Sequence, residues 1–433
     1  MIKSPGVSTL PKRIRIPRAT LVVLCGPVGC GKSTFAAKHF LPTRVVSSDA
    51  CRAMVADDEA DQSATPQAFS LLHAIVRRRL ARGRFTVADS TALTRPARRR
   101  LLSIARNQDC GAVLLVFDIP LAACIAWNAT RPRRVKERVM ARQAEQFART
   151  LPHLDNEGFD EVWILGREDL DSAVVEVIPP VVERAEGGPF DVIGDVHGCH
   201  EELVTLLGRL GYRRDDDAFA HPRGRQAIFL GDLPNRGPDT PGVIATVAAM
   251  VARARALYIP GNQCAKLYHA LRGERAKPKP AVAATLEAID ALAPAKREGI
   301  VNDFLALFES APPYLVLDEG RFVVTHAGIE ESMMGKTSDR VIRFVREGEV
   351  VGCTPEGRPV RRDWAATYRG APLVVYGHTP RSRPVFVNNT INIDQGCVYG
   401  GALSALRYPE REVMSEPARR VYWPVKSRPD GAC

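Results

Sequence analysis

Residues 21–40, LVVLCGPVGCGKSTFAAKHF, constrain the fold more than any other stretch of the chain. Their apolar start predicts a buried strand, the glycine-rich middle predicts a tight loop, and the end predicts the opening of a helix. The loop matches the spacing G-x-x-x-x-G-K-S/T, in which backbone N–H groups surround phosphates, the lysine reaches the outer phosphates and the hydroxyl ligates magnesium. We therefore expect ATP to bind at Gly26, Gly29, Gly31, Lys32, Ser33 and Thr34, with Ser33 ligating Mg²⁺.

The rest of the first half alternates strand and helix patterns. Strands are predicted at residues 44–48, 85–88, 112–117 and 162–165, and helices at residues 66–82 and 95–106. This alternation is typical of an α/β domain with a parallel sheet and helices on both faces. Ligands of such sheets bind beyond the carboxyl ends of the strands, where Gly26, Asp49 and Asp89 would converge. The basic residues 1–20 are expected to form a loose arm before the first strand.

A basic segment at residues 121–147 follows the predicted sheet strands. It is a candidate arginine lid, because arginine stabilises the charge on a transferring phosphoryl group. An exposed basic helix without a catalytic role is the alternative interpretation. The arginines of the segment that matter for the lid are Arg131, Arg133, Arg134, Arg138 and Arg142.

Length, charge and cysteine usage limit the class of protein. At 433 residues the chain is long enough for two domains. The net charge of +11 suggests a polyanionic partner such as nucleic acid, although part of the arginine content could be solvated surface. The 10 cysteines show no paired spacing and no secretory leader precedes them, which favours reduced thiols in a cytoplasmic protein. No apolar run is long enough to span a bilayer, so no membrane association is expected.

A second set of motifs occupies the C-terminal half, after a proline- and glycine-rich linker at residues 179–189. Each stretch places aspartate, asparagine or histidine after a strand-like run, and the stretches are GDVHG at 194–198, GDLPNRGPDT at 231–240, GNQCAKL at 261–267, THAG at 325–328 and YGHTP at 376–380. Oxygen and imidazole ligands in this mixture suit a pair of divalent ions such as Mn, Fe or Zn. The candidate ligands are Asp195, His197, Asp232, Asn262, His326 and His378. Asp232 is the candidate bridge between two ions roughly 3.5–4 Å apart.

The order and wording of these motifs resemble the calcineurin-like binuclear metallophosphatases over about residues 190–417. With the phosphate-loop kinase pattern in front, the chain resembles bacterial polynucleotide kinase-phosphatases, which heal RNA ends. The resemblance implies a P-loop kinase domain at residues 1–178, the linker, an α/β metallophosphatase sandwich at residues 190–417 and a tail at residues 418–433. Fuller family members continue into a ligase-like domain, which we expect to be absent from this sequence or removed from it.

The resemblance also implies a role for individual residues. In the first half Lys32 and Ser33 would bind the ATP phosphates and Mg²⁺, and Asp49 would be the general base for a 5′-hydroxyl. Arg52 would hold the acceptor phosphate, Arg131 and Arg134 would be the lid arginines, and the strand-end acid Asp89 has no settled role. In the second half the six candidate ligands would hold two divalent ions, Mn²⁺ in this interpretation, and Arg236 would bind phosphate.

Two positions depart from the metallophosphatase pattern. The superfamily usually reads G-D-x-x-D-R-G and G-N-H, and its aspartate and histidine form a dyad that protonates the leaving oxygen. This chain has Asn235 and Gln263 there. An amide cannot donate a proton near neutral pH, and loss of a general acid costs about 10²–10⁴ in rate. We expect bound metal with weak phosphatase activity, retained toward esters with good leaving groups.

The residues leave several functions open. The first is an ATP-dependent 5′-hydroxyl polynucleotide kinase fused to a weakened phosphatase that processes 3′ ends or 2′,3′-cyclic phosphates in RNA repair. The second keeps both activities, the third is a small-molecule P-loop kinase, and the fourth is a nucleic-acid-binding scaffold with a non-catalytic phosphatase fold. The expected partners are RNA or DNA ends and a separate ligase, and a homodimer stays open.

Overall fold

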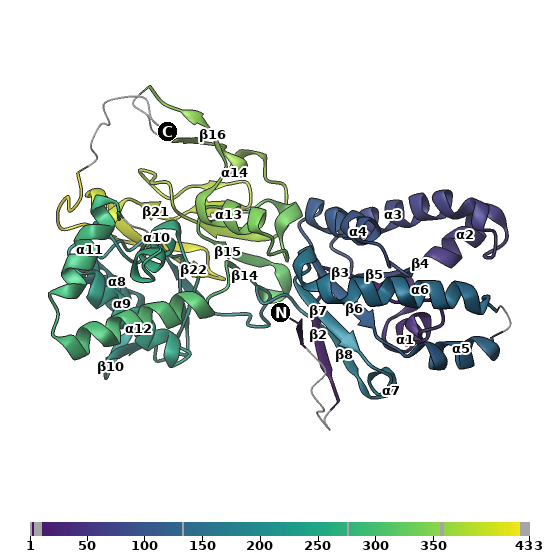
Figure 1. The fold of residues 1–433 in the computed structure, drawn as a ribbon. Coiled ribbons are helices and arrows are strands. Elements are labelled where there is room, and N and C mark those ends of the chain that lie inside the picture. The colour runs from purple at the N-terminus through teal and green to yellow at the C-terminus, as the bar shows by residue number, and fades with distance from the viewer. Residues whose placement is uncertain (1, 4–10, 132–133, 275–276, 356–358, 425–433) are drawn as a thin grey trace. The chain divides into compact units, whose positions relative to one another are not determined.

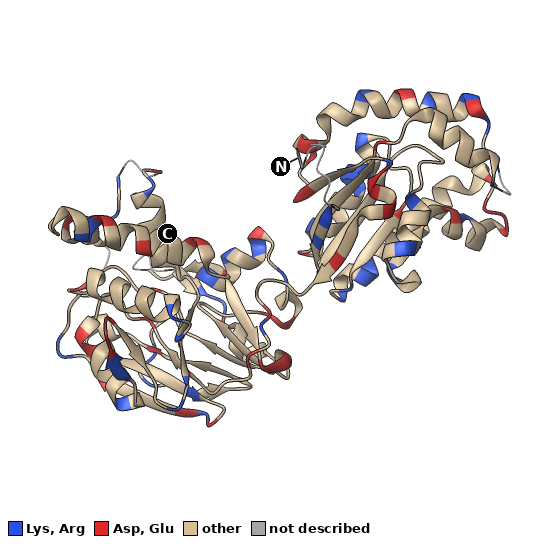
Figure 2. Cartoon of the chain, turned by 90° about the horizontal axis from the view of Figure 1, so that it is seen from below, with Lys and Arg blue, Asp and Glu red and all other residues tan. Residues whose placement is uncertain are grey.

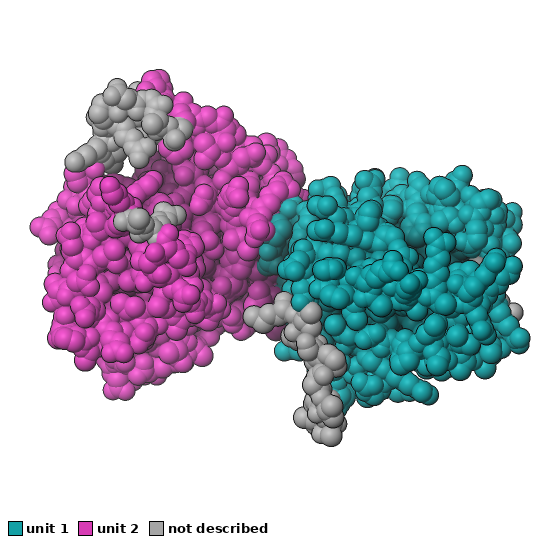
Figure 3. Space-filling model, in the orientation of Figure 1, with its two compact units in different colours: residues 1–180, 335–338 teal, residues 181–334, 339–433 magenta. Residues whose placement is uncertain are grey.

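A computed structural model describes residues 2–3, 11–131, 134–274, 277–355 and 359–424 of the chain (Figure 1). The chain divides into two compact units, coloured separately in Figure 3. The first contains residues 1–180 together with 335–338, and the second contains residues 181–334 and 339–433.

The first unit is built on a parallel 6-stranded sheet in the order β1-β7-β6-β3-β5-β4. Its strands are β1 (Ile2–Lys3), β3 (Thr20–Cys25), β4 (Val45–Ser47), β5 (Thr86–Asp89), β6 (Gly111–Phe117) and β7 (Glu161–Leu165). Every residue of β3 is buried, as expected for a central strand covered on both faces. The parallel α/β sheet predicted from the alternating patterns is therefore confirmed.

Helices cover both faces of this sheet because neighbouring residues of β3 point in opposite directions. Leu21 and Val23 pack with apolar residues of α3 and α4, whereas Val22 and Leu24 pack with residues of α1, α5 and α6. The helical elements are α1 (Lys32–His39), η1 (Pro42–Arg44), α2 (Ser48–Ala56), η2 (Gln62–Ala64), α3 (Thr65–Ala81), α4 (Arg95–Asn107), α5 (Leu121–Ala129), α6 (Glu137–Thr150), η3 (Leu151–Glu157) and α7 (Asp169–Ser172).

The prediction of a loose arm at residues 1–20 is wrong for its described C-terminal part. Strand β2 (Arg13–Pro17) pairs in parallel with β8 (Val174–Ile178) in a separate 2-stranded sheet. Ile14 and Ile16 are fully buried while their neighbours are exposed, so the segment has the period of a half-buried strand. The basic and proline residues masked that alternation in the sequence.

The second unit is an α/β sandwich of two sheets, as predicted. One is a 6-stranded sheet in the order β13-β12-β9-β22-β21 with β23 added beside β22, and the other is a 5-stranded sheet in the order β14-β15-β18-β20-β19. Its strands are β9 (Phe190–Ile193), β12 (Gln226–Phe229), β13 (Ala256–Tyr258), β21 (Asp394–Gln395), β22 (Ala402–Tyr408), β23 (Glu412–Pro417), β14 (Tyr314–Leu317), β15 (Phe322–Thr325), β18 (Leu373–Tyr376), β19 (Phe386–Val387) and β20 (Thr390–Asn392).

The core of the sandwich lies between the two sheets. Val192 of β9, Val324 of β15 and Val375 of β18 belong to one buried cluster, whereas Ile193, the next residue of β9, packs with helices on the outer face. The remaining elements are α8 (His200–Leu210), β10 (Arg213–Asp215), β11 (Ala218–Ala220), α9 (Thr240–Ala252), α10 (Asn262–Leu271), α11 (Pro280–Asp290), α12 (Pro294–Ser310), η4 (Asp318–Gly320), η5 (Glu331–Met333), α13 (Asp339–Glu347), β16 (Val350–Cys353), β17 (Pro359–Arg361), α14 (Trp364–Thr367) and η6 (Cys397–Tyr399).

Within the described residues, the helices lack the combination of length and apolarity that crossing a membrane requires. The buried cysteines described are free thiols, but Cys353, at the exposed end of β16, is disulfide-bonded, so the prediction that all cysteines are reduced is wrong at this position. Basic and acidic residues occur on helices and loops of both units (Figure 2).

Candidate functional site

Loops at the carboxyl ends of strands bring the predicted metal ligands of the second unit together. Asp195 follows β9, Asp232 follows β12, His326 follows β15 and His378 follows β18. These residues and His197 form two groups, Asp195–His197–Asp232 and Asp232–His326–His378, and within each group one ligand atom per residue lies within 4.8 Å of the others. Asp232 belongs to both groups, which is the position expected of a bridging carboxylate.

Backbone carbonyls orient two of the histidines. His197 Nδ1 lies 3.2 Å from the Pro234 carbonyl oxygen, and His326 Nδ1 lies 3.0 Å from that of Leu230. A carbonyl can only accept, so Nδ1 carries the proton in both rings and Nε2 keeps its lone pair. These Nε2 atoms lie 3.7 Å and 3.5 Å from the two carboxylate oxygens of Asp232.

The third histidine, His378, has one ring nitrogen that no described residue binds. His378 Nδ1 lies 3.1 Å from His326 Nε2, and His378 Nε2 is buried with no hydrogen-bond partner among the described residues. Burial lowers the pKa of His197 to about 4 and lowers the pKa of His326 and His378 as well. Neutral imidazoles that face one another and a shared carboxylate fit divalent cations, so the residues suit a metal pair.

The backbone is strained where these side chains meet. His197, Asp232 and His378 have φ values of 48°, 41° and 72°, in the left-handed region that non-glycine residues rarely adopt. Gly261 allows the close approach of another loop, since a Cβ there would lie 2.2 Å from Asp232 Oδ1. The backbone N–H of Gln263 donates to the same Asp232 oxygen over 2.7 Å. Asn262, between Gly261 and Gln263 in the chain, is the first residue of α10.

Asp394 belongs to the site but was missed in the sequence. It is the first residue of β21 and is buried, and burial together with the charge of Asp232 raises its pKa to about 7 although the Gly396 N–H lowers it. Burial and the charges of Asp394 and Asp232 also raise the pKa of Asp195. An aspartate directly after the alternating stretch Thr-Ile-Asn-Ile at residues 390–393, typical of a short strand, was the signal that would have located Asp394.

The substituted dyad positions lie beside the predicted phosphate-binding arginine. Asn235 Nδ2 donates to the Gln263 carbonyl over 3.2 Å. When the Gln263 amide is oriented to satisfy its surroundings, its side-chain oxygen accepts from Lys266 Nζ over 2.6 Å and from Arg236 over 3.2 Å. Arg236 also donates to His197 Nε2 over 3.0 Å. Asn235 and Gln263 therefore occupy the site without supplying an acid.

The glycine loop of the first unit lies between β3 and α1, as its motif requires. Gly29 and Gly31 have φ values of 83° and 89°, which a side chain would disfavour. Lys32 is buried and donates to the carbonyl oxygens of Gly26 and Pro27 over 2.9 and 2.6 Å. Ser33 and Thr34 follow in the exposed first turn of α1. The loop therefore has the backbone shape that surrounds phosphates.

Two acidic residues end or follow the neighbouring strands β5 and β4: Asp89 ends β5, and Asp49 lies two residues after β4. Burial raises the pKa of Asp89, while a hydrogen bond with Ser33 and the charges of Lys32 and Arg131 lower it and the charge of Asp49 raises it. The structure therefore places these groups within electrostatic reach of Asp89. Asp49 lies in the first turn of α2, where its Oδ1 accepts from Arg52 over 2.6 Å.

The arginine-rich segment packs on the glycine loop through α5 and α6. The Val28 N–H donates to Gln143 Oε1 over 2.9 Å, and a Cβ at Gly29 would lie 3.0 Å from Met140 Cε and 3.1 Å from the Cys124 carbonyl oxygen. Asn128 closes the connection between the helices by exchanging two hydrogen bonds with the Val135 backbone, at 2.9 and 3.0 Å. Arg134, Arg138 and Arg142 are exposed, Arg131 is half-buried, and Arg133 lies outside the described residues.

Comparison with known proteins assigns each unit to a group. Residues 21–151 match the family described as the AAA domain, and residues 188–382 match the calcineurin-like phosphoesterases. The chain therefore joins a kinase-like P-loop domain to a calcineurin-like phosphoesterase domain.

Curated relatives match the second half of the chain along almost their whole length. Proteins named asymmetrical bis(5′-nucleosyl)-tetraphosphatase PrpE are 44% identical over 241 residues in Anoxybacillus flavithermus, 47% over 240 residues in Geobacillus thermodenitrificans and 43% over 241 residues in Bacillus subtilis. Each alignment covers 55% of this chain, and the relatives are covered to 98%, 98% and 99%.

Proposed function

The chain belongs, through its C-terminal half, to the calcineurin-like phosphoesterase family, and we propose that it is an enzyme with two phosphoryl-transfer sites. In this proposal the C-terminal unit hydrolyses nucleotide phosphates with two divalent ions, Mn²⁺ by preference. The N-terminal unit transfers the γ-phosphate of ATP to the 5′-hydroxyl of a polynucleotide with Mg²⁺.

The shared position of Asp232 carries the hydrolase part of the proposal. A carboxylate that belongs to two ligand groups at once suits two neighbouring ions. Asp195, His197, Asp232, Asn262, His326 and His378 would hold them. Such a pair activates a water molecule and neutralises charge on the phosphate oxygens. Arg236, which already contacts His197, would orient the phosphate against the ligand loops.

The substituted dyad restricts the substrate. Without an acid at position 263, the leaving oxygen departs unprotonated, so a leaving group that is stable as an anion is favoured. A phosphoanhydride has such a leaving group, whereas the sugar alkoxide of an RNA 3′-phosphate does not. The names of the relatives support a dinucleoside polyphosphate as the first substrate, and a 3′-phosphate or 2′,3′-cyclic phosphate of RNA is the second candidate.

The kinase part rests on the groups around the glycine loop. Lys32 and Ser33 would bind the triphosphate and Mg²⁺, and Asp49 would accept the proton of the attacking hydroxyl. Arg52, buried beside Asp49, orients that carboxylate and would hold the phosphate of the acceptor. Arg131 and Arg134 would act from the lid. The net charge of +11 favours a polynucleotide over a small metabolite as the acceptor.

The hydrolase is tested by supplying Mn²⁺ with a dinucleoside tetraphosphate, an aryl phosphate and an RNA 3′-phosphate in parallel. We expect the first two to turn over and the third to react at least about 10²-fold more slowly, because only the third needs a general acid. Equal turnover of all three would contradict the proposal. The variant Asp232→Asn should lose all hydrolysis, and a wild-type chain that binds RNA without any turnover would support the scaffold alternative instead.

The kinase is tested by transfer of labelled γ-phosphate to an oligonucleotide with a 5′-hydroxyl. Asp49→Asn and Lys32→Ala should each lower the rate by about 10²-fold or more. Asp57→Asn is the matched control, because Asp57 lies at the other end of α2 in a left-handed conformation that asparagine tolerates. Transfer that weakens steeply with salt indicates several phosphate contacts, whereas phosphorylation of small acceptors alone would contradict the proposal.

A further inference from the structure

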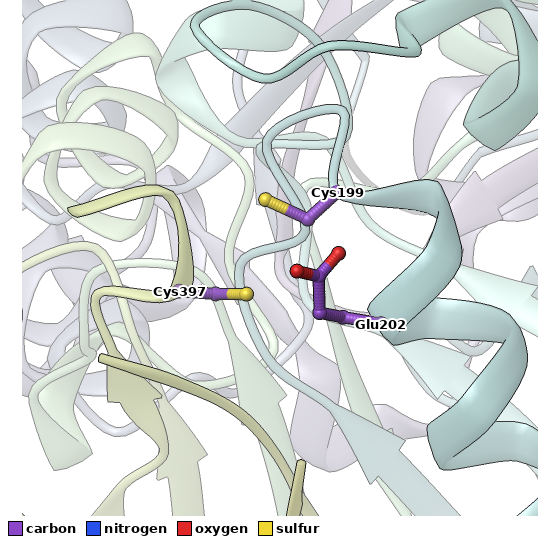
Figure 4. A group of neighbouring side chains, drawn as sticks. All are labelled: Cys199, Glu202 and Cys397. Atoms are coloured by element: carbon purple, nitrogen blue, oxygen red, sulfur yellow. The ribbon is translucent and has the colours of Figure 1, made fainter. Parts of the chain in front are cut away.

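A second group of potential metal ligands lies in the C-terminal unit and shares no residue with the phosphoesterase site. Figure 4 shows Cys199, Glu202 and Cys397 pointing toward one another. Cys199 caps the start of α8, Glu202 lies in its first turn, and Cys397 begins η6. One ligand atom of each lies within 4.8 Å of the other two. Their exposed fractions are 0%, 1% and 1%, so the cluster is closed to bulk solvent.

One oxygen of the cluster has no donor. Glu202 Oε1 accepts from the Arg419 N–H over 3.0 Å and from the Tyr422 hydroxyl over 2.7 Å. Glu202 Oε2 is buried without a hydrogen-bond partner among the described residues, so neither thiol donates to it. A buried carboxylate oxygen left without a partner is costly. Its lone pairs and those of two sulfur atoms converge on the same space, which is the environment of a cation.

We propose that Cys199, Glu202 and Cys397 bind a zinc ion. Thiolates select soft and borderline ions such as zinc over Mn²⁺ or Mg²⁺. Sulfur and oxygen ligands of one tetrahedral zinc ion lie about 3.5–3.8 Å apart, within the limit that the cluster meets. On binding, each thiol releases its proton to solvent and forms one Zn–S bond, and Glu202 binds through Oε2. The site carries a net charge of −1, as a Cys₃His zinc site does, and a water molecule fills the fourth position.

The ion would connect two segments that follow residues of the phosphoesterase site with the segment that contains Arg419 and Tyr422. Cys199 lies two residues after His197, and Cys397 lies three residues after Asp394. Glu202, bound to the same ion, would also hold the segment after β23, because Arg419 and Tyr422 donate hydrogen bonds to its other oxygen. The Tyr422 N–H also donates to the Val398 carbonyl over 3.1 Å, next to Cys397. Zinc here is structural and is additional to the ions of the catalytic pair.

Cobalt substitution tests the site in the full-length chain, purified under reducing conditions. Co²⁺ bound by thiolates gives a sulfur-to-metal charge-transfer band in the near ultraviolet, which ions held by oxygen and nitrogen lack. We expect this band in the wild type and its loss in Cys199→Ser/Cys397→Ser. Two variants should keep it: Asp232→Asn, which disables the catalytic pair, and Cys110→Ser, which removes a buried free thiol of the first unit.

Elemental analysis gives a second measurement that does not depend on replacing a cysteine. The wild type should retain one equivalent of zinc after the weakly held ions are dialysed away. Glu202→Gln keeps both thiols but removes a direct ligand. It should weaken zinc binding by more than the roughly 10–100-fold that follows loss of a residue that only hydrogen-bonds to a ligand. Absence of the cobalt band in the folded wild type, or equal zinc in the wild type and the double cysteine variant, would overturn the proposal. So would a Cys199–Cys397 disulfide in zinc-free folded protein.

Discussion

Asn235 Nδ2 donates a hydrogen bond to the backbone carbonyl of Gln263 over 3.2 Å, which joins the loop after β12 to the start of α10. Asn235 Oδ1 is buried without a partner among the described residues, whereas the Gln263 side chain is held by Lys266 and Arg236. The Asn235 side chain therefore binds the backbone of Gln263 and not its side chain, and neither amide supplies a proton.

Restoring the acid should broaden the range of leaving groups. The change Gln263→His with Asn235→Asp should raise hydrolysis of an alkyl phosphate by about 10²-fold or more, because the leaving alkoxide is then protonated. Hydrolysis of an aryl phosphate should change little, and the ratio of the two rates is the measurement. Gln263→His alone should give less, since the imidazolium lacks its carboxylate. An equal gain on both esters would contradict this explanation.

A methyl group at position 261 should displace the shared carboxylate. The added Cβ of Gly261→Ala would lie 2.2 Å from Asp232 Oδ1 and 2.7 Å from His326 Cε1, so both ligands must move. A misplacement of about 1 Å lowers the rate by about 10²-fold, and metal content should fall with it. Gly208→Ala is the control, because nothing lies near its Cβ and alanine in α8 should stabilise by about 0.5–1 kcal/mol. Full metal content in Gly261→Ala would contradict the explanation that the added Cβ displaces Asp232 and His326.

The Arg98–Glu157 pair should be needed for the stability of the first unit. Arg98 Nε and NH2 bind the two Glu157 oxygens at 2.7 and 2.6 Å, and the side chains are 1% and 3% exposed. Arg98→Met leaves a buried carboxylate and should cost about 3–5 kcal/mol of unfolding free energy. The double variant Arg98→Met/Glu157→Met should recover most of this loss in urea unfolding. Additive losses would show that the two residues do not act as a pair.

The Arg225–Glu410 pair should stabilise the second unit only above acid pH. A hydrogen bond from Arg225 lowers the pKa of Glu410, so the unfolded chain binds a proton first as pH falls. Its contribution is present above the ordinary glutamate pKa and is lost as pH falls through the lower, folded value. Glu410→Gln should lower the free energy of unfolding at pH 7 by about 1 kcal/mol or less, because Glu410 is 40% exposed. Tm should fall with it, and the difference between variant and wild type should vanish in acid. Glu412→Gln, exposed on β23, is the control. A difference independent of pH would contradict the pair.

Local sequence patterns were sufficient to predict the sheet strands and the fold class of both units. The strands of the first unit were predicted within a residue or two, as for β5 and β6, because buried strands are apolar runs bounded by turn residues. Parallel strands end at one edge, so motifs that follow them are brought together regardless of their distance in sequence. The roles of Asp49, Arg52, Arg131, Arg134 and Arg236 stay predictions; the structure shows Arg52 bound to Asp49 and Arg236 bound to His197.

The sequence by itself determined the α/β class of both units, the glycine loop and the strand-end positions of the metal ligands, since these depend on short-range patterns. Only the tertiary structure decided that β2 pairs with β8, that Arg98 meets Glu157, 59 residues away, and that Asp394 is buried where its charge acts on Asp195. It alone also brought Cys199, Glu202 and Cys397 together. Each of these contacts joins residues distant in the chain whose types are individually common, so burial and distance were needed to identify them.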